Sequence, residues 1–283
     1  METHLGACYR EIVMITTQLQ PVGMLLREWR QRRRLSQLDL ACEAEISTRH
    51  LSFLETGRSL PSREMVLRLA EQLDVPLRGR NTLLMAAGYA PVFPERPLED
   101  PALQGARKAI DLVLAGHEPY PALAIDRHWT LIASNHAVTP MLVGVDPSLL
   151  QPPINVLRLS LHPAGLAPRI ANLGEWRAHL LARLRRQIEV SADPTLIELL
   201  RELSDYPVND GDQSEISAND EEYAGVVVPF RLVTEGGTLS FFSTTTIFGT
   251  PVDITLSELT IESFFPADTA TAVALGRAFH RGE

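Results

Sequence analysis

Two short helices with start and stop signals lie close together in this sequence, and they constrain the fold more than any other feature. The stretch Ser36-Gln37-Leu38-Asp39 is a capping-box pattern, which predicts a helix that begins after Ser36. Ser47 is placed to cap a second helix, and Gly57 to end it in the left-handed conformation that glycine adopts at little cost. Only about three residues separate the two helices. We therefore expect a tight turn between them.

Apolar residues at helical spacing predict further helices around this pair. They recur from Val22 onward, ahead of an arginine-rich run at 30–34. Pro61-Ser62 is typical of a helix start, and residues 81–87 are predicted to form a last helix. About five short helices within residues 21–90 make an all-α unit that contains a helix-turn-helix.

The outward face of the helix between Ser47 and Gly57 carries residues suited to reading DNA. Leu51 and Leu54 mark its buried side, because residues three apart share a helix face. Four residues point outward or lie at the flank: Thr48, Arg49, Ser52 and Phe53. An outward arginine can donate two hydrogen bonds to guanine, worth about 1–3 kcal/mol of base discrimination. For Phe53 two interpretations stay open, contact with a thymine methyl or packing against the following loop.

The charge of the chain is distributed unevenly. Residues 21–90 hold 11 arginines, no lysine and 8 acidic residues, a net charge of +3. Residues 91–283 carry a net charge of −11, within a total of −9. Such asymmetry suggests that a segment which meets a polyanion is joined to one that does not.

A known family is indicated by one stretch of the first domain, LSQLDLACEAEISTRHLSFLETGRSLPS. It closely resembles the helix-turn-helix of the XRE, or Cro and phage-repressor-like, regulators of bacteria, down to the Ser-Gln that opens one helix and the Leu-Glu-x-Gly that ends the next. The resemblance implies that Thr48, Arg49, Ser52 and Phe53 read the bases of double-stranded DNA. It also implies a set of phosphate contacts: Arg30, Arg34, Gln37 and Arg58. For Gln37 the physics agrees, because free N–H groups and the dipole at a helix start favour a phosphate. We expect Glu55 to be structural, bonded within the domain.

The remainder of the chain indicates a second domain. A stretch rich in proline and acidic residues, APVFPERPLEDP, marks a boundary, and Leu103 to Gly116 is an amphipathic connecting helix. We expect four segments: an N-terminal extension without predicted order (1–20), the helix-turn-helix domain (21–90), a linker with its connecting helix (91–118) and a second domain (119–283).

The order of elements in the second domain predicts its fold class. Residues 121–135 form two short strands, and Asn135 is placed to cap the helix that follows. Two helical stretches come next, and β-rich runs then begin at Gly225, Thr238 and Ile254. This is an α+β layout, an antiparallel sheet of about five strands with helices on one side.

The second domain also resembles a known family. Three segments resemble the ligand-binding domain of the MmyB-like regulators: HEPYPALAIDRHWTLIASN, NVLRLSLHPAGLAPRIANLGEWRAHLLARLRRQ and LSFFSTTTIFGTPVDITLSELTIESFFPADTATA. With the helix-turn-helix, the resemblance covers residues 21–275. It implies a PAS-like sensor for a small apolar effector of the fatty-acyl kind, so that a bound fatty acid is expected. Our candidates are Trp129, Phe242, Phe248 and Phe264 as apolar lining, with Asn135 or Arg231 as a polar anchor. The alternative for each aromatic residue is an ordinary core position.

Other functional classes lack their signatures. The eight histidines form no HExxH motif, and no GxSxG or Walker A motif occurs, so we expect no enzyme and no cofactor. Cys8 and Cys42 predict neither a disulfide framework nor a zinc site, and Cys42 is expected to be a small buried residue. No apolar run reaches the roughly 18 residues of a membrane helix, and no signal-peptide pattern occurs. We expect a cytoplasmic protein that binds no membrane.

Together these observations predict a transcriptional regulator that binds an operator, as a homodimer, under the control of a small apolar effector. One alternative is a regulator whose second domain serves only dimerisation or partner binding, without a ligand. Another is an antitoxin or phage-type repressor, against which the long second domain argues.

Overall fold

The computed structural model describes residues 20–207, 228–249, 251 and 253–281. These residues form two compact units, and the chain passes from one to the other between Pro94 and Glu95, inside the predicted linker. The predicted N-terminal extension, apart from Gln20, lies outside the described residues, as does the polar stretch at 209–222.

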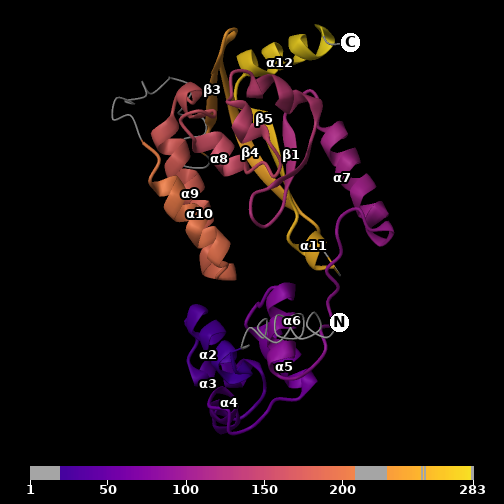
Figure 1. The fold of residues 1–283 in the computed structure, drawn as a ribbon, viewed down its shortest axis with the longest axis vertical. Coiled ribbons are helices and arrows are strands. Elements are labelled where there is room, and N and C mark those ends of the chain that lie inside the picture. The colour runs from indigo at the N-terminus through magenta and orange to yellow at the C-terminus, as the bar shows by residue number, and fades with distance from the viewer. Residues whose placement is uncertain (1–19, 208–227, 250, 252, 282–283) are drawn as a thin grey trace, which may run out of the picture. The chain divides into compact units, whose positions relative to one another are not determined.

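The first unit is all helical, as Figure 1 shows. Its elements are α2 (Val22–Arg32), α3 (Gln37–Glu43), α4 (Thr48–Glu55), α5 (Arg63–Gln72) and α6 (Leu77–Ala86). The predicted capping box at Ser36 and Asp39 is confirmed, with each side chain bonded to the other residue's backbone N–H. Ser47 accepts from the His50 N–H at the start of α4, and Gly57 follows it with a φ of +71°.

Three details of this unit differ from the sequence prediction or go beyond it. Cys42 lies in α3 but is exposed, because Ala41 occupies the inward position beside it. The start of α6 lies at Leu77, earlier than predicted, after Pro76. Packing requires glycine at position 23, although no sequence pattern indicated it. A Cβ there would lie 2.3 Å from the Leu54 carbonyl oxygen, so α2 can cross the end of α4 only with glycine at this position.

The second unit is built on a five-stranded antiparallel sheet in the order β2-β1-β5-β4-β3. Its strands are β1 (Ala122–Ile125), β2 (Leu131–Ser134), β3 (Phe230–Thr234), β4 (Gly237–Ile247) and β5 (Thr260–Pro266). Its α-helices are α7 (Gln104–Gly116), α8 (Val156–Leu161), α9 (Leu173–Ser191), α10 (Pro194–Ser204), α11 (Ile254–Ser257) and α12 (Thr269–Arg281). Short 3-10 helices cover Pro101–Leu103, His136–Leu142, Pro147–Leu150 and Ala167–Arg169. The predicted α+β class is confirmed.

The β-rich run predicted to begin at Ile254 divides into two elements. Its first four residues form α11, because the Asp253 carboxylate caps them by accepting from the Thr255 N–H at 2.9 Å. The strand β5 then begins at Thr260. The run predicted from Gly225 is described only from Val228, and its strand begins at Phe230.

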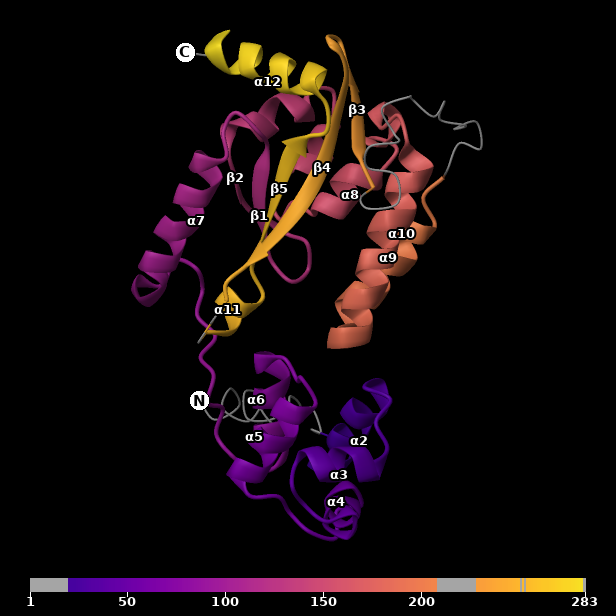
Figure 2. The same ribbon diagram turned by 180° about the vertical axis from the view of Figure 1, so that it is seen from behind.

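Helices cover both faces of the sheet, as Figure 2 shows. The sequence predicted helices on one side only, and α7 covers the second face as well. On one face Leu123 and its neighbours pack toward α8, α9 and α10. On the other face Ala122, Ala124 and Ile261 contact α7 through Ile110 and Leu114. The predicted connecting helix is therefore part of the second domain's packing.

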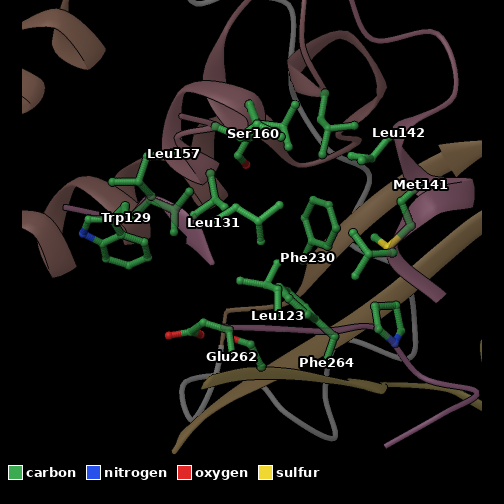
Figure 3. A pocket seen from close by; sticks show the side chains of 18 of the residues that line it. Leu123, Trp129, Leu131, Met141, Leu142, Leu157, Ser160, Phe230, Glu262 and Phe264 are labelled. Atoms are coloured by element: carbon green, nitrogen blue, oxygen red, sulfur yellow. The ribbon is translucent and has the colours of Figure 1, made fainter. Parts of the chain in front are cut away.

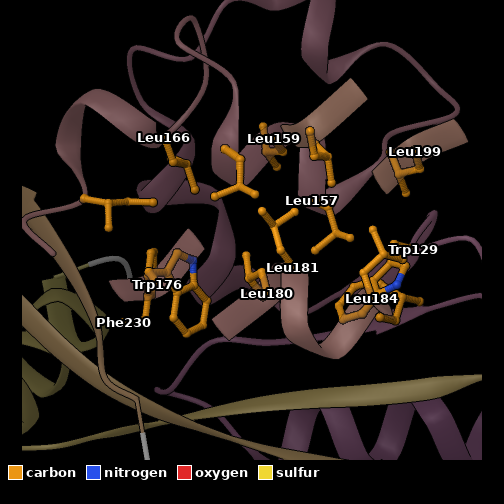
Figure 4. Packing of buried hydrophobic residues seen from close by; sticks show 14 of the residues in the cluster. Trp129, Leu157, Leu159, Leu166, Trp176, Leu180, Leu181, Leu184, Leu199 and Phe230 are labelled. Carbon is orange, nitrogen blue, oxygen red and sulfur yellow. The ribbon is translucent and has the colours of Figure 1, made fainter. Parts of the chain in front are cut away.

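The main core of the second unit lies between the sheet and the helices α8, α9 and α10. Figure 4 shows Trp176, Leu180 and Leu184 of α9 pointing toward this core. Phe230 approaches them from β3, with its ring centroid 5.0 Å from that of Trp176. The packing is not complete along this interface, and the gap that remains is the cavity described below.

Candidate functional site

The outward face of α4 presents the predicted base-reading residues together. Thr48 and Arg49 are exposed in its first turn, while Ser52 and Phe53 are half-buried. The guanidinium of Arg49 lies over the Phe53 ring, 5.3 Å from its centroid, and that of Arg58 lies 5.7 Å from the same centroid. An aromatic ring attracts a cation through its negative face. Phe53 therefore gathers two cations on the outer surface of the helix.

The packing interpretation of Phe53 also has support. Its carbonyl oxygen accepts from the N–H groups of Arg58 and Ser59, at 2.9 and 3.2 Å, so the loop after α4 folds back on the helix. This bond pattern places Arg58 beside the ring. The Phe53 ring thus holds two arginine guanidinium groups on the outer surface of α4.

Three of the four predicted phosphate contacts are accessible. Arg34 and Arg58 are exposed, and Arg34 follows α2 with a φ of +57°. Gln37 is half-buried at the first position of α3, where its Nε2 donates to Glu55 at 2.7 Å. Their contacts with DNA stay a prediction.

Arg30 was predicted as the fourth phosphate contact, and the structure corrects this. Its Nε and Nη2 donate to the two carboxylate oxygens of Glu55 at 2.6 and 2.9 Å, and its Nη1 donates to the Leu35 carbonyl oxygen at 2.8 Å. Both charged side chains are buried. The hydrogen bond to Glu55 raises the pKa of Arg30, so the cation persists there. The predicted structural role of Glu55 is confirmed.

The sequence carried a signal for this pair. Arg30 follows Val22 and Leu26 at intervals of four, so it shares their buried helix face. A second arginine of the same run is also structural, since the Arg33 guanidinium donates to the carbonyl oxygens of Leu73 and Asp74. Of the arginine run, Arg32 and Arg34 are the exposed members.

An apolar cavity lies in the second unit between the sheet and the helices α8 and α9. It has a volume of about 100 Å³ and is partly open. Figure 3 shows Leu123, Phe230 and Phe264 at its sheet side, with side chains from the opposite helices and loops closing around them. Two of the predicted lining residues, Trp129 and Phe264, are in its wall. The lining is almost entirely hydrocarbon, which is typical of a site for an apolar ligand.

One end of the cavity is polar. Arg183 Nη2 donates to Glu262 Oε1 at 2.6 Å and to the Thr245 hydroxyl at 3.2 Å. The same guanidinium lies over the Trp129 ring, 4.9 Å from its centroid. Glu262 is buried, whereas 21% of the Arg183 side chain is exposed, so the cation reaches solvent from this end.

Arg183 and Glu262 were missed from the sequence, although both positions carried a signal. Arg183 follows Trp176 and Leu180 at helical spacing, so it lies on the inward face of α9. Glu262 is two residues before Phe264 in β5 and therefore shares its side of the sheet. A charged residue on an apolar face is a candidate functional group, and only the fold showed that these two meet.

Asn135 was predicted as a polar anchor or as a helix cap, and the structure assigns it a different role. Its Oδ1 accepts from the Ala122 N–H, and its Nδ2 donates to the carbonyl oxygens of Leu114 and Tyr120. The buried amide joins α7 to β1, does not cap the following 3-10 helix and is not part of the cavity wall.

The other three candidates also lie away from the cavity. Phe242 stacks on Phe265, with ring centroids 5.3 Å apart, and these two alternate with Ser243 and Phe264 on the cavity side. Phe248 packs against the α7 cluster on the opposite face. The backbone of Arg231 bonds to residues 171 and 172, and its side chain is not in the cavity wall. Strand periodicity separates the two faces, but the sequence does not say which face is hollow.

His179 lies close to the polar end of the cavity. Its ring stacks on Trp176, with centroids 5.5 Å apart. Burial, aided by the charges of Arg183 and Arg186, lowers the pKa of His179 below its ordinary value. The imidazole is therefore kept neutral near pH 7.

Comparison with known proteins agrees with this geometry. Residues 106–278 match the family model described as MmyB-like transcription regulator ligand binding domain, and residues 26–79 match a helix-turn-helix model. Over 78 residues the chain is 37% identical to the protein named "Uncharacterized HTH-type transcriptional regulator RghRB" of Bacillus subtilis (strain 168). That match covers 27% of this chain and 54% of the relative, about half its length. In the part of the chain that the structure describes, we find no helix long and apolar enough to span a membrane.

Proposed function

This chain belongs to the family of MmyB-like transcription regulators, and on that premise we propose that α4 reads an operator while the cavity of the second unit binds a small apolar effector. The chain carries a DNA-binding helix-turn-helix and a domain of the ligand-binding type. The proposal concerns the finer points, which are the residues that read DNA and the chemistry of the effector.

The DNA-reading part of the proposal is supported by the cationic outer face of α4. Arg49 and Arg58 flank Phe53, and Arg34 adds an exposed cation at the end of α2. The first turn of α4 presents Thr48 and Arg49 to solvent, as a recognition helix presents its N-terminal residues to base edges. We infer that Thr48, Arg49, Ser52 and Phe53 face the major groove of double-stranded DNA. Arg34, Gln37 and Arg58 would then contact phosphates.

The observation that carries the effector proposal is the hydrocarbon cavity with one polar end. Its volume of about 100 Å³ lies near that of an engineered apolar cavity of about 150 Å³ that stays dry and admits benzene. A slim alkyl chain suits such a space better than a fused ring system, and it need not fit entirely inside because the cavity is partly open. A fatty-acyl ligand would place its chain against Leu123 and Phe264. Its polar head would lie near Arg183, the cation that reaches solvent.

The expected assembly follows from the way such domains bind DNA. Helix-turn-helix dimers contact two half-sites about 34–36 Å apart, so a homodimer is the proposed form. An effector then acts by preferring one arrangement of the dimer, because a ligand shifts a population only through its differential affinity. The site of action is proposed to be the cytoplasm, and the proposal requires no cofactor.

Native mass spectrometry of the full chain tests the effector proposal directly. We expect protein purified from cells to retain an adduct of the mass of a fatty acid, and delipidated protein to regain one when dodecanoate is added. The matched variant Val138→Trp fills the cavity wall with a larger side chain and should retain none. Equal loading of both proteins would place the adduct outside the cavity and refute the assignment.

A further inference from the structure

The chain is held firmly on the DNA-binding side of the division between the two units. The Asn81 side chain of α6 accepts from the N–H groups of Val92 and Phe93, at 3.0 and 3.1 Å. Its Nδ2 donates to the Phe93 carbonyl oxygen at 2.7 Å. Because Asn81 is buried, these three bonds fix the backbone up to Phe93 against the first unit.

The chain is fixed again only three residues later, on the sensor side. Arg96 Nη1 donates to Asp253 Oδ2 at 3.2 Å, and the Arg96 carbonyl oxygen accepts from the Thr255 hydroxyl at 2.6 Å. Asp253 is completely buried and also caps α11. Arg96 therefore moves with the start of α11.

Only Pro94 and Glu95 separate these two anchors. Three residue steps span at most about 10 Å, and proline fixes one of the backbone angles. So short a connection holds little slack to absorb a displacement of α11. The pair Pro94-Glu95 forms the hinge between the two anchors.

The opposite end of α11 is connected to the cavity wall. Glu258 follows α11, and its carboxylate pairs with Arg127 Nε at 3.6 Å. Arg127 belongs to the turn between β1 and β2, and its carbonyl oxygen accepts from Gln187 Nε2 at 2.7 Å. Gln187 in turn accepts from the Trp129 indole N–H at 2.8 Å. Trp129 lines the cavity, so the turn, α11 and Arg96 form one connected set.

The position of Trp129 suits it to respond to an occupant. Its φ is +65°, a left-handed conformation that is rare for a bulky residue and is held here by the surrounding contacts. Its ring is covered by Arg183, the cation placed at the polar end of the cavity. A ligand head group that binds Arg183 would alter the contact between the Arg183 guanidinium and the Trp129 ring.

We propose that the β1–β2 turn, α11 and Arg96 form a coupling strap, through which occupancy of the cavity at Trp129 acts on the DNA-binding unit across the hinge Pro94-Glu95. This inference rests on the proposed function, because it explains how an effector in that cavity would alter operator affinity. Each step is a contact between adjacent groups, and the hinge is the step at which motion passes from one unit to the other. The strap is a physical basis for coupling of the usual size, about 5- to 150-fold in affinity.

Lengthening the hinge tests the last step of this route. A Gly-Ser-Gly-Ser insertion between Pro94 and Glu95 adds slack and leaves both anchors intact. The matched control carries the same insertion between Glu235 and Gly236, in the turn that joins β3 to β4. The probe is dodecanoate, and the DNA is a duplex selected from random sequences with the wild-type chain. We expect the control to keep the change in operator affinity that dodecanoate produces and the hinge variant to lose it, with equal dodecanoate affinity in both.

Breaking the strap tests its middle steps. Glu258→Gln and Arg96→Ala each remove one contact and leave the cavity wall unchanged. Arg158→Ala is the control, since it breaks the Arg158–Glu202 ion pair outside the route. Amide hydrogen exchange of residues 254–257 should change about fivefold or more on loading in the wild type and the control. It should change much less in Glu258→Gln. Arg96→Ala should keep the change at α11 and weaken the effect on DNA, since the Thr255 hydroxyl still donates to the Arg96 carbonyl oxygen.

The two proposals fail in different ways in these experiments. If dodecanoate does not bind, the effector proposal fails, and the cavity-filling variant Val138→Trp then tests the strap without a ligand. That variant should change exchange at residues 254–257 and alter operator affinity, and both effects should disappear when Glu258→Gln is added. If the cavity is occupied or filled while α11 exchange stays the same, the strap is wrong and the effector site stands. An unchanged response of operator affinity in the hinge variant also overturns the strap.

Discussion

The Arg30 guanidinium donates to both carboxylate oxygens of Glu55, at 2.6 and 2.9 Å, and both side chains are buried. The pair joins α2 to the last residue of α4, the helix proposed to read DNA. Gln37 of α3 donates to the same carboxylate, so one buried anion holds three helices together. The arginine run therefore contributes to the domain's structure as well as to its exposed charge.

Removing one member of this pair should destabilise the first unit strongly. We expect Arg30→Ala to lower the free energy of unfolding by about 3–5 kcal/mol, because it leaves the buried Glu55 charge without its cation. Urea denaturation followed by circular dichroism measures this. The double variant Arg30→Met/Glu55→Met should recover much of the loss, and a single variant that unfolds like the wild type would contradict the buried role of the pair.

Arg34 should behave in the opposite way to Arg30. Because Arg34 is exposed, Arg34→Ala should leave the unfolding free energy within about 0.5 kcal/mol of the wild type. It should weaken binding to all DNA sequences alike and reduce the slope of log affinity against log salt by about 1. Fluorescence anisotropy at several salt concentrations gives this slope. An unaltered slope would remove Arg34 from the phosphate contacts.

Arg49 should carry sequence discrimination. Arg49→Ala is expected to reduce the preference for operator over random DNA by about 1–3 kcal/mol and to retain most non-specific affinity. Phe53→Leu should produce a smaller loss of the same kind, since it removes the ring beneath Arg49 and Arg58. Competition binding with the two DNA types separates these effects. Equal discrimination in Arg49→Ala and the wild type would reject the assignment of α4 as the reading helix.

The polar end of the cavity should distinguish ligands by their head groups. A carboxylate head must share Arg183 with Glu262, so Glu262→Gln is expected to tighten dodecanoate binding. Arg183→Met should lower the affinity for dodecanoate by about tenfold or more, which corresponds to the loss of one hydrogen bond to a charged group. It should lower the affinity for dodecanol much less. Isothermal titration of both ligands against the three proteins measures this. The same loss for both ligands would mean that Arg183 contributes packing rather than charge recognition.

Stability should depend on pH through His179. Its folded-state pKa is lowered below the ordinary 6.5, so between the two values the unfolded chain binds more protons than the folded one. Stability is therefore expected to fall as the pH decreases through 6.5 toward the folded-state pKa. His179→Gln should flatten this part of the curve, measured by urea denaturation from pH 7.5 to 5.5. A parallel curve for the variant would exclude His179 as the titrating group.

The helical domain could be predicted closely because its signals are local. Ser36, Ser47 and Gly57 act on backbone groups within one turn of themselves, so their sequence positions suffice to place helix ends. The alternation of side chains in the strands is equally local, and it gave the α+β class and an antiparallel sheet. Where local signals compete, as at Asp253 before the final strand, the cap prevailed over the β-rich run that follows.

The functional residues of the second domain depended on packing and could be predicted only in part. Periodicity places Phe264 on one face of the sheet and Phe242 on the other, but it does not say which face leaves a cavity. The partners of Asn135 are 13 to 21 residues away in sequence, too far for a local pattern to reveal.

By itself, the sequence determined the two-domain order, the helix-turn-helix with its outward face at Thr48 and Arg49, and the fold class of the sensor. Only the tertiary structure decided that Arg30 is buried against Glu55 and that Arg183 meets Glu262 at the end of an apolar cavity. The physical reason is the range of the interactions. Helix caps and face periodicity act within a few residues, whereas an ion pair or a cavity depends on groups that folding brings together from 25 and 79 positions apart.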